Sequence, residues 1–190
     1  MLRYTIIDTN QSHQETFSML IDFFSDLMHI DHYEEKKHRL IIYYQSHEKL
    51  NLKAMIYAMI AETYQDLRLY QSHTFDDQEA LNAHVIYMEK QLDLIAFNTY
   101  TYIDDHIFLK HHLTHKLPID HKKILRKYSN RSDIHHTIKT FLECNQNINQ
   151  AAKELYIHRN TLLQRLDKFH QATGFDVKRF LDAFIIYQIL

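Results

Sequence analysis

The chain has 190 residues, 45 % of them hydrophobic, and a formal net charge of −2. This length suits one medium domain or two small ones, and the apolar content is typical of a globular protein. It contains one Gly, one Pro and one Cys, which argues against glycine-rich phosphate loops, all-β folds with tight turns and a disulfide framework. Because neither a signal peptide nor a run of about 18 apolar residues is present, we expect a cytoplasmic protein without a membrane span.

The charges are unevenly distributed along the chain. Residues 1–114 hold 9 Lys and Arg against 17 Asp and Glu, a balance of −8, whereas residues 115–190 hold 13 against 7, a balance of +6. A basic half is typical of a module that approaches a polyanion such as DNA. The contrast predicts an acidic domain joined to a basic one; a chance distribution of solvated charge is the alternative.

The first half alternates between strand and helix patterns. Runs of β-branched, aromatic or alternating apolar residues predict three strands, at 3–7, 38–44 and 65–73. Apolar residues at helical spacing predict three helices, at 14–28, 52–64 and 76–92. The last of these is expected to be capped by Asp76 or Asp77. After a break near Asn98, a further helix is expected to resume at Asp104 or Asp105.

Pro118 lies where the charge changes sign. The residue before a proline is pushed out of the α region, so a helix is not expected to run through this point. We therefore predict an acidic α/β domain at 1–116 and a basic, all-helical domain at 117–190. Helices in the second domain are expected to begin after N-cap residues, namely Asp120, Ser132 or Asp133, Asn149 and Asp176.

Residues 132–176 have the pattern of a helix-turn-helix. A first helix ends at Asn145, which can take the left-handed conformation that ends a helix. A short helix follows, and Leu155 and Ile157 lie on either side of the turn that connects it to the next helix. A longer helix then runs from about 158–173 and stops at the glycine, Gly174. Its residues Leu162, Leu166 and Phe169 are expected to face inward, and the remaining positions to face outward.

The outward face of the longer helix carries side chains that can read DNA. An α-helix fits the major groove, where Arg pairs with guanine, Asn and Gln pair with adenine, and Thr contacts thymine methyls or phosphates. We predict that bases are read or clamped by Arg159, Asn160, Thr161, Gln164 and Arg165. Phosphate contacts are predicted for Lys153 and Lys168. His158, at the start of the helix, is also predicted to bind DNA. The alternative is an amphipathic helix whose polar face is merely solvated.

The run TIKTFLECNQNINQAAKELYIHRNTLLQRLDKFHQATGFDV resembles the C-terminal helix-turn-helix domain of PucR-type transcriptional regulators, a relative of the Fis-like DNA-binding fold. The resemblance covers roughly residues 132–190 and rests on A-A-x-x-L, H-R-N-T-L and T-G-x-D. Gln164 and Asp167 depart from the family pattern, and Asp167 would repel phosphate if it pointed outward. Residues 35–113 weakly resemble the GGDEF-like domain that precedes this module in many members. They contain no GGDEF signature, so nucleotide cyclisation is not inferred.

The chain has sixteen histidines, several of them close together around 106–121. His111 and His115 are one helical turn apart, with His106, His112 and His121 nearby, so a helical zinc or nickel site is geometrically possible. Neither an H-E-x-x-H motif nor a Cys pair supports such a site, nor is there a catalytic motif. We therefore predict no metal site, no cofactor and no catalytic residue.

These patterns together predict a mostly α, α+β protein that is a bacterial, DNA-binding transcriptional regulator and not an enzyme. It is expected to act as a homodimer on a palindromic double-stranded operator. The acidic domain would be regulatory or dimerising and would take an unknown small-molecule or protein effector. The last helix, with Phe180, Leu181, Phe184 and Ile185, is expected to close the domain core or else to form a dimer seam. Two alternatives are an interaction protein whose helix-turn-helix has lost DNA binding, and a His-rich metal-responsive protein.

Overall fold

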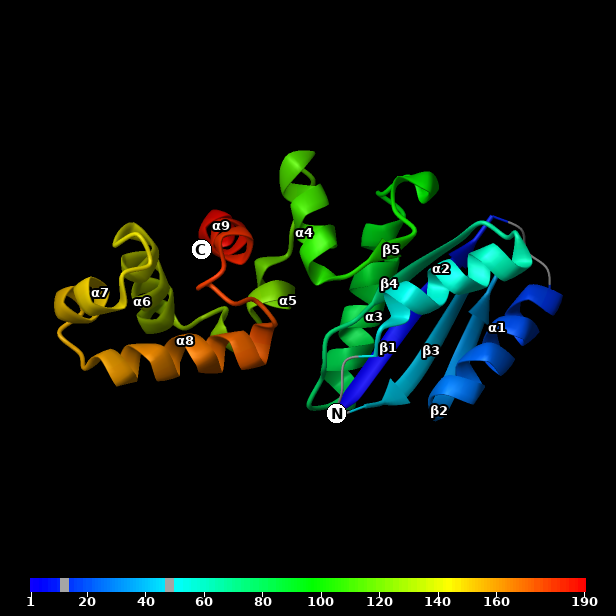
Figure 1. Ribbon diagram of the computed structural model, residues 1–190, viewed down its shortest axis with the longest axis horizontal. Helices are drawn as coiled ribbons and strands as arrows, with labels where there is room; N and C mark the ends of the chain where they lie inside the picture. Colours follow the sequence, from blue (N-terminus) through cyan, green and yellow to red (C-terminus); the bar gives the residue numbers. More distant parts are fainter. Residues whose placement is uncertain (11–13, 47–49) are drawn as a thin grey trace. The chain divides into compact units, whose positions relative to one another are not determined.

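The computed structural model describes residues 1–10, 14–46 and 50–190 (Figure 1). The chain divides into two compact units, Met1–Asp105 and His106–Leu190. Helix α4 (Asp105–Thr114) begins at the last residue of the first unit and otherwise belongs to the second, whereas the sequence pattern places α4 in the first domain. Within the described residues, no helix is long and apolar enough to cross a membrane.

The first unit is built on a five-stranded sheet with the strand order β2-β3-β1-β4-β5. The strands are β1 (Leu2–Thr9), β2 (Ile30–Lys36), β3 (Arg39–Gln45), β4 (Leu67–Gln71) and β5 (Tyr102–Ile103). Strand β1 lies in the middle and pairs antiparallel with both β3 and β4. Strand β5 is short and pairs parallel with β4.

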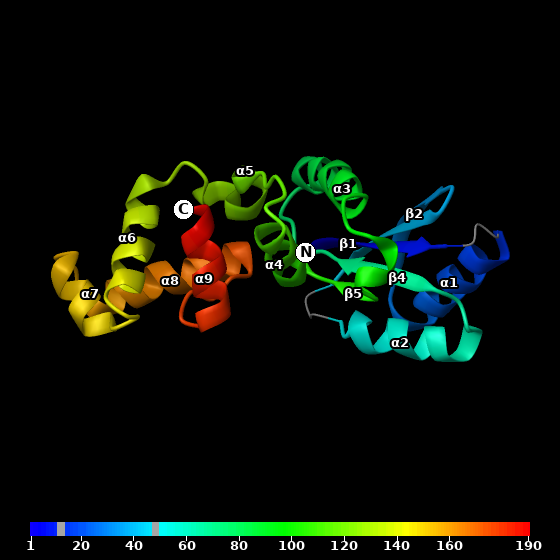
Figure 2. The same ribbon diagram turned by 90° about the horizontal axis from the view of Figure 1, so that it is seen from above.

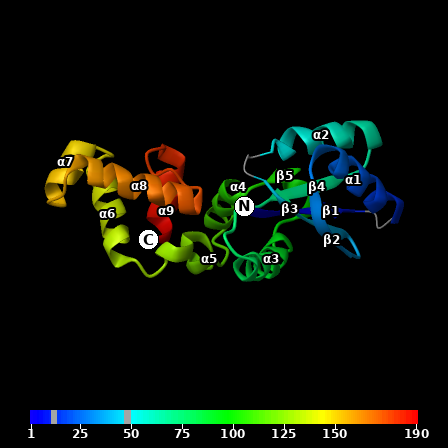
Figure 3. The same ribbon diagram turned by 90° about the horizontal axis from the view of Figure 1, so that it is seen from below.

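Helices cover both faces of this sheet. Helices α1 (Gln14–Leu27) and α2 (Leu52–Thr63) lie on one face and α3 (Gln78–Leu92) on the other, as Figures 2 and 3 show from opposite sides. A strand that is covered on both faces has no solvent-facing positions, and it is therefore apolar or internally hydrogen-bonded throughout. Accordingly, β1 is buried from Arg3 to Thr9 and β4 along its whole length.

The three predicted strands are confirmed as β1, β3 and β4, and the predicted helices as α1, α2 and α3. Strands β2 and β5 were not predicted. In β2, six of the seven residues are exposed, because it is an edge strand, so it lacks the apolar alternation that marks a half-buried strand. Strand β5 has only two residues and follows the short 3₁₀ helix η1 (Phe97–Thr99), where the break near Asn98 was expected.

The second unit is all helical. Besides α4 and the 3₁₀ turn η2 (Arg126–Tyr128), it consists of α5 (His121–Leu125), α6 (Ser132–Glu143), α7 (Ile148–Glu154), α8 (Arg159–Thr173) and α9 (Phe180–Ile189). Its core is formed by fully buried side chains from three helices and from the segment after α8, namely Ile138, Phe141, Leu162, Leu166, Phe169, Phe175 and Ile186. The predicted inward face of α8 is thereby confirmed.

Several predicted helix ends are confirmed. The side chain of Asp77 accepts a hydrogen bond from Ala80 N and caps α3, and Asp120 caps α5 in the same way. Asn145 has a φ of 52° after α6, and Gly174 has a φ of 84° after α8. Both residues thus take the left-handed conformation that ends a helix.

Three predicted caps are wrong. The carboxylate of Asp133 binds Arg131 instead of capping α6, whose N-cap position is Arg131 itself. Helix α7 is capped by Asn147 rather than by Asn149, because the Asn147 side chain accepts from Gln150 N at 3.1 Å. Asp176 forms a local turn by accepting from Lys178 N, so α9 begins only at Phe180.

The later start of α9 changes which residues close the core. Ile185 is buried, as predicted, together with Ile186 and Ile189. The expectation that Phe180, Leu181 and Phe184 close the core is wrong, because they are 75 %, 63 % and 54 % exposed; the alternative, a dimer seam, stays a prediction. These three side chains and Tyr187 lie at helical spacing and form one exposed apolar stripe along α9. We call these four residues the α9 stripe.

Candidate nucleic-acid interface

The turn between α7 and α8 is tight and well bonded. Ala151 and Ala152 of α7 are buried, and their carbonyl groups accept hydrogen bonds from Leu155 N and Ile157 N across the turn. Between these two residues, Tyr156 has a left-handed φ of 53°. Small side chains on α7 permit the close crossing that a helix-turn-helix needs. The direction in which α8 leaves the turn is therefore fixed by backbone bonds.

His158 is the N-cap of α8. Its Nδ1 accepts a hydrogen bond from Asn160 N at 3.2 Å, and the ring is otherwise exposed. Because Nδ1 is an acceptor, the neutral imidazole carries its proton on Nε2. An exposed N–H donor thus stands at the N-terminal end of α8, where the helix dipole already favours an anion.

The predicted DNA-binding side chains are exposed, with one exception. Asn160, Gln164 and Lys168 follow one another at intervals of four along α8, with Thr161 beside them; Arg159 lies at the leading end and Lys153 on α7. Residues four apart share a helix face. The structure therefore brings a continuous row of amide, hydroxyl and ammonium groups to one surface of the domain.

The exception is Arg165, which is half-buried and points toward α6. Its Nη1 donates to Thr137 Oγ1 at 2.9 Å, and Thr137 is itself buried. Arg165 was predicted from its position in the sequence to read or clamp DNA. The hydrogen bond shows that it also joins two helices of the domain.

Asp167, which departs from the family pattern, is neutralised within the domain. Its carboxylate accepts a hydrogen bond from Lys178 Nζ at 2.7 Å. This hydrogen bond raises the pKa of Lys178 above its usual value. The repulsion between Asp167 and phosphate is correspondingly reduced.

The C-terminal end of α8 is held by Arg126, which was not predicted as a functional residue. Its guanidinium donates to the carbonyl oxygens of Ala172 and Thr173, the second at 3.2 Å. A cation that binds the last carbonyl groups of a helix also interacts favourably with the helix dipole. With His158 at one end and Arg126 at the other, both termini of α8 are capped by side chains.

Tyr156 is a further exposed residue that the sequence analysis did not select. It lies in the turn just before α8, and 96 % of its surface is exposed. A tyrosine in the turn just before the predicted recognition helix is the signal in the sequence that could have indicated it. It lies two residues before His158 in the chain, and a tyrosine hydroxyl can donate to a phosphate.

The histidines around 106–121 that were considered for a metal site differ in their contacts and in their burial. The rings of His111 and His115 stack at 4.1 Å, and His115 Nδ1 lies 2.9 Å from the carbonyl oxygen of His111. Burial lowers the pKa of His112 to about 4 and also lowers the pKa of His111. These two imidazoles are thus neutral at pH 7. In the described part of the chain, a group of three possible metal ligands lies instead in the first unit, at His73, His84 and Asp105.

The fold and the exposed face of α8 define the second unit as a helix-turn-helix domain of the regulatory kind. Residues 134–189 match the PucR C-terminal helix-turn-helix domain, and this segment is such a domain. The resemblance seen in the sequence is thereby confirmed for this part of the chain. The match points to a regulatory protein rather than to an enzyme.

Three proteins of Bacillus subtilis (strain 168) are similar to this chain. Uncharacterized protein YxkF is 27 % identical over 149 residues, which cover 75 % of this chain and 50 % of that protein. The Purine catabolism regulatory protein is 33 % identical over 57 residues, covering 30 % of this chain and 11 % of its own length. Uncharacterized protein YsfB is 33 % identical over 69 residues, which cover 36 % of this chain and 19 % of that protein. The chain thus spans half or less of the length of these relatives.

A solved structure also aligns with this chain. It is the crystal structure of a regulator of polyketide synthase expression from Bifidobacterium adolescentis. The alignment covers 99 % of this chain and 78 % of the chain in that structure, with a TM-score of 0.47 and 16 % sequence identity.

Proposed function

We propose that the protein is a sequence-specific, DNA-binding transcriptional regulator whose helix α8 enters the major groove of double-stranded DNA. The observation that carries this proposal is the exposed row of Asn160, Thr161, Gln164 and Lys168 on α8, behind Arg159 at the leading end. These side chains have the donor and acceptor patterns that distinguish base pairs in the major groove. The position of α8, fixed at both ends, supports the same role because base readout needs a rigidly held helix.

Within this row we assign two roles. Arg159, Asn160, Thr161 and Gln164 would contact base edges, since they are exposed and lie in the first half of α8. Phosphate contacts would come from the periphery of the row, namely from Lys153, Tyr156, His158 and Lys168. Such contacts set the orientation of the domain on the duplex and supply most of its salt-dependent affinity.

Arg165 takes a different role in this proposal. Its hydrogen bond to the buried Thr137 directs the guanidinium toward α6. We assign Arg165 as a positioning residue that holds α8 against α6, and not as a base-reading residue. The other N–H groups of its guanidinium could contact only a phosphate at the edge of the interface.

We further propose that the protein binds a palindromic operator as a homodimer. Helix-turn-helix dimers place two recognition helices about one DNA turn apart, roughly 34 Å. The α9 stripe offers a self-complementary surface for a second copy, because its four large apolar side chains are between 46 % and 75 % exposed. Beside it, a groove of about 420 Å³ between the end of α6 and α9 is lined by Leu142 and Phe184, among others. We propose α9 of the second copy as the occupant of this surface.

We propose that the first unit is the regulatory or dimerising part of the protein and that it binds an effector of unknown chemistry. We also propose that the protein acts in the bacterial cytoplasm. The acidic balance of residues 1–114 supports this division, because a −8 charge would repel DNA while the +6 of residues 115–190 attracts it.

The experiment that tests the proposal is a selection of genomic DNA fragments by the purified full chain, followed by sequencing. The parent is compared with an Arg159→Ala/Gln164→Ala variant and with a His170→Ala control. His170 is exposed, but it lies in the last turn of α8, far along the helix from Arg159 and Gln164. We expect the parent and the control to enrich promoters that share an inverted repeat, and the double variant to lose this enrichment. If all three enrich the same diffuse background, α8 does not read DNA, and a protein partner should be sought.

A further inference from the structure

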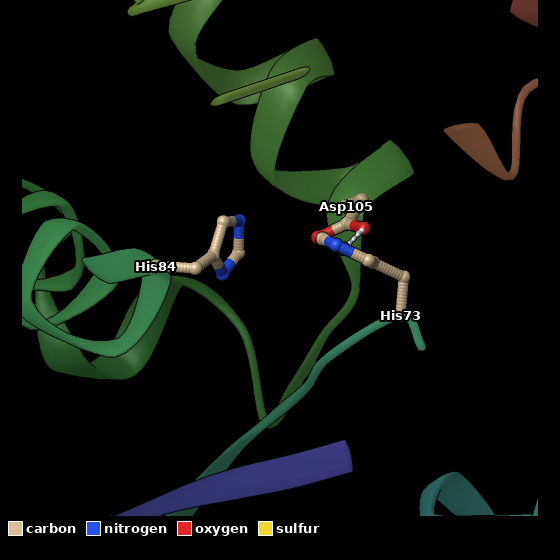
Figure 4. Close-up of side chains that lie close together, drawn as sticks. All are labelled: His73, His84 and Asp105. Carbon is tan, nitrogen blue, oxygen red and sulfur yellow. Dashed lines mark hydrogen bonds and ion pairs between the residues drawn. The ribbon is translucent and has the colours of Figure 1, made fainter. Parts of the chain in front are cut away.

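Three polar side chains that are distant in the sequence meet inside the first unit. His73 follows strand β4, His84 lies on α3, and Asp105 is the first residue of α4 (Figure 4). Each offers one atom that can bind a metal ion, and these atoms all lie within 4.8 Å of one another. Figure 4 shows the His73 ring against the Asp105 carboxylate and the His84 ring turned toward both.

The cluster is shielded from water but not sealed. His84 is only 3 % exposed, and the side chains of His73 and Asp105 are 9 % and 13 % exposed. The ring of Phe75 lies 4.2 Å from that of His73 and 5.1 Å from that of His84, measured between ring centroids. A low-polarity shell of this kind strengthens the attraction between a cation and its ligands, and the remaining exposure leaves a path for an ion to enter.

Two of the candidate ligands are oriented by groups outside the cluster. Tyr4 Oη lies 2.7 Å from His84 Nδ1, and Tyr70 donates from its hydroxyl to Asp105 Oδ1 at 2.6 Å. His73 Nδ1 lies 2.7 Å from the other carboxylate oxygen, Asp105 Oδ2. Metal-binding imidazoles and carboxylates commonly have such outer hydrogen bonds, which fix the tautomer and the ring orientation. With Nδ1 engaged by Tyr4, Nε2 is the nitrogen of His84 that would face an ion.

We propose that His73, His84 and Asp105 form a binding site for a divalent transition-metal ion, with zinc as the first candidate. Two imidazole nitrogens and one carboxylate oxygen suit zinc, cobalt, nickel or ferrous iron rather than magnesium or calcium, which prefer oxygen ligands. Three protein ligands leave one position of a tetrahedral ion open to water or to a small ligand. The site goes beyond the proposed DNA-binding function and does not depend on it.

The geometry requires only a local adjustment to accept an ion. Zinc bonds of about 2.0–2.2 Å in a tetrahedral arrangement place two ligand atoms roughly 3.4 Å apart. The 2.7 Å contact between His73 and Asp105 would therefore open slightly as the ion replaces the proton between them. His73 Nδ1 has to lose its proton to bind the ion: a neutral ring then carries its proton on Nε2, and a doubly protonated ring releases one proton to solvent. The ligand atoms lie within 4.8 Å of one another, so His84 also has to move closer to the other two, by up to about 1.4 Å, to close the third side of the site.

The sequence does not reveal this cluster, because the spacing of its residues matches no metal motif. His73, His84 and Asp105 are separated by 11 and 21 positions and come together only through the sheet and the helices that cover it. The histidines that seemed suitable by spacing, His111 and His115, stack on each other instead. They provide the matched control for the experiment.

The experiment is metal binding by the full chain, purified without a histidine tag and stripped with a chelator. Zinc, cobalt and nickel are added one at a time at micromolar concentration, and the bound metal is measured by mass spectrometry after dialysis. We expect about one ion per chain, and a loss of affinity of at least about tenfold in His84→Gln and in Asp105→Asn. A His111→Gln/His115→Gln variant should bind like the parent. The proposal is overturned if the parent binds no stoichiometric ion, or if only the His111/His115 variant loses it.

Two further measurements separate a metal site from a purely structural ion pair. Bound cobalt should show the intense visible absorption of a tetrahedral ion with nitrogen ligands, and this band should be absent in Asp105→Asn. Zinc should raise the Tm of the parent and not that of Asp105→Asn, since a ligand that binds only the folded state stabilises it. Circular dichroism of the metal-free variants is the check that they are folded. If zinc raises the Tm of the parent and of Asp105→Asn equally, the ion binds elsewhere and the proposed site is wrong.

Discussion

Arg165 of α8 donates a hydrogen bond from Nη1 to Oγ1 of Thr137 on α6, at 2.9 Å, and the same hydroxyl donates to the carbonyl oxygen of Asp133 at 2.8 Å. Thr137 is 1 % exposed, so the guanidinium is joined to a buried polar group. Arg159, six positions earlier, is exposed at the leading end of α8. Two arginines with similar predicted roles thus have different surroundings.

This difference predicts separable effects of the two arginines. Arg165→Ala should lower the free energy of unfolding by about 1–3 kcal/mol, because it removes a charged donor from a buried hydroxyl. Arg159→Ala should change it by less than about 0.5 kcal/mol, since the residue is exposed and not needed for packing. Denaturant unfolding of both variants measures these changes. Equal stability of the two variants would show that the bond to Thr137 does not hold α8 in place.

The salt dependence of DNA affinity should report the proposed phosphate contacts. Lys153→Ala and Lys168→Ala should each reduce the slope of log K against log[salt] by about 1, because each removes one contact that releases counterions. Binding to a selected promoter fragment and to random DNA of the same length, at several salt concentrations, measures the slope. Lys139→Ala on α6 is the control. An unchanged slope in both lysine variants would remove these residues from the interface.

Gly174 should be required for its backbone conformation alone. It has a φ of 84°, and a Cβ atom added there would meet no atom within 4 Å. Gly174→Ala should therefore cost roughly 1–2 kcal/mol of stability through the left-handed φ and not through a clash. Gly174→Asn should cost less, because asparagine tolerates this conformation better. Thermal unfolding of both variants is the measurement, and an equal or larger loss in the asparagine variant would contradict this explanation.

The parts of the second unit that the sequence predicts correctly are those set by local signals. Gly174, Asn145 and the spacing of Leu162, Leu166 and Phe169 act through contacts close in the sequence, and all are confirmed. The caps failed where two polar residues compete, as with Asn147 and Asn149. Either can accept from the helix start, and the turn formed by residues 144–147 selects the first of them.

Long-range relationships could not be predicted in the same way. Strand β2 is an exposed edge with no periodic signal, and the cluster of His73, His84 and Asp105 depends on the packing of α3 against the sheet. The orientation of Arg165 depends on α6, 28 residues earlier in the chain. Pattern alone assigned Arg165 to the outward face, because it lies at the border between the exposed and buried sides of α8.

His112 should make stability depend on pH. It is fully buried, and burial lowers its pKa from 6.5 to about 4, with smaller contributions from His111 and His115. The unfolded chain therefore takes up a proton before the folded one does as the pH falls. The contribution of His112 is complete above about pH 6.5 and is lost as the pH falls to about 4.

Replacing this histidine should flatten that profile. In His112→Leu, the loss of unfolding free energy between pH 7.5 and pH 5 should be smaller than in the parent by about 1–2 kcal/mol. His121→Gln, an exposed histidine on α5, serves as the control and should follow the parent. Denaturant unfolding at the two pH values measures the difference. If His112→Leu retains the full pH dependence, other groups are responsible for it.

The α9 stripe should control assembly without controlling the fold of the domain. Phe184 is 54 % exposed, whereas Ile186, two residues later on the same helix, is fully buried. Phe184→Glu places a charge in the proposed seam between two copies, so it should convert dimers to monomers in sedimentation equilibrium and leave the stability of the domain within about 0.5 kcal/mol. Ile186→Ala should instead destabilise the domain by about 2–5 kcal/mol.

DNA binding distinguishes this seam from one formed elsewhere. A Phe184→Glu monomer should lose affinity for a full palindrome and keep its affinity for a single half-site, because the contacts of one α8 are unchanged while the second α8 is no longer attached. If Phe184→Glu remains a dimer and binds the palindrome like the parent, the two copies are joined through another surface. The exposed apolar side chains of α9 would then not form the dimer interface.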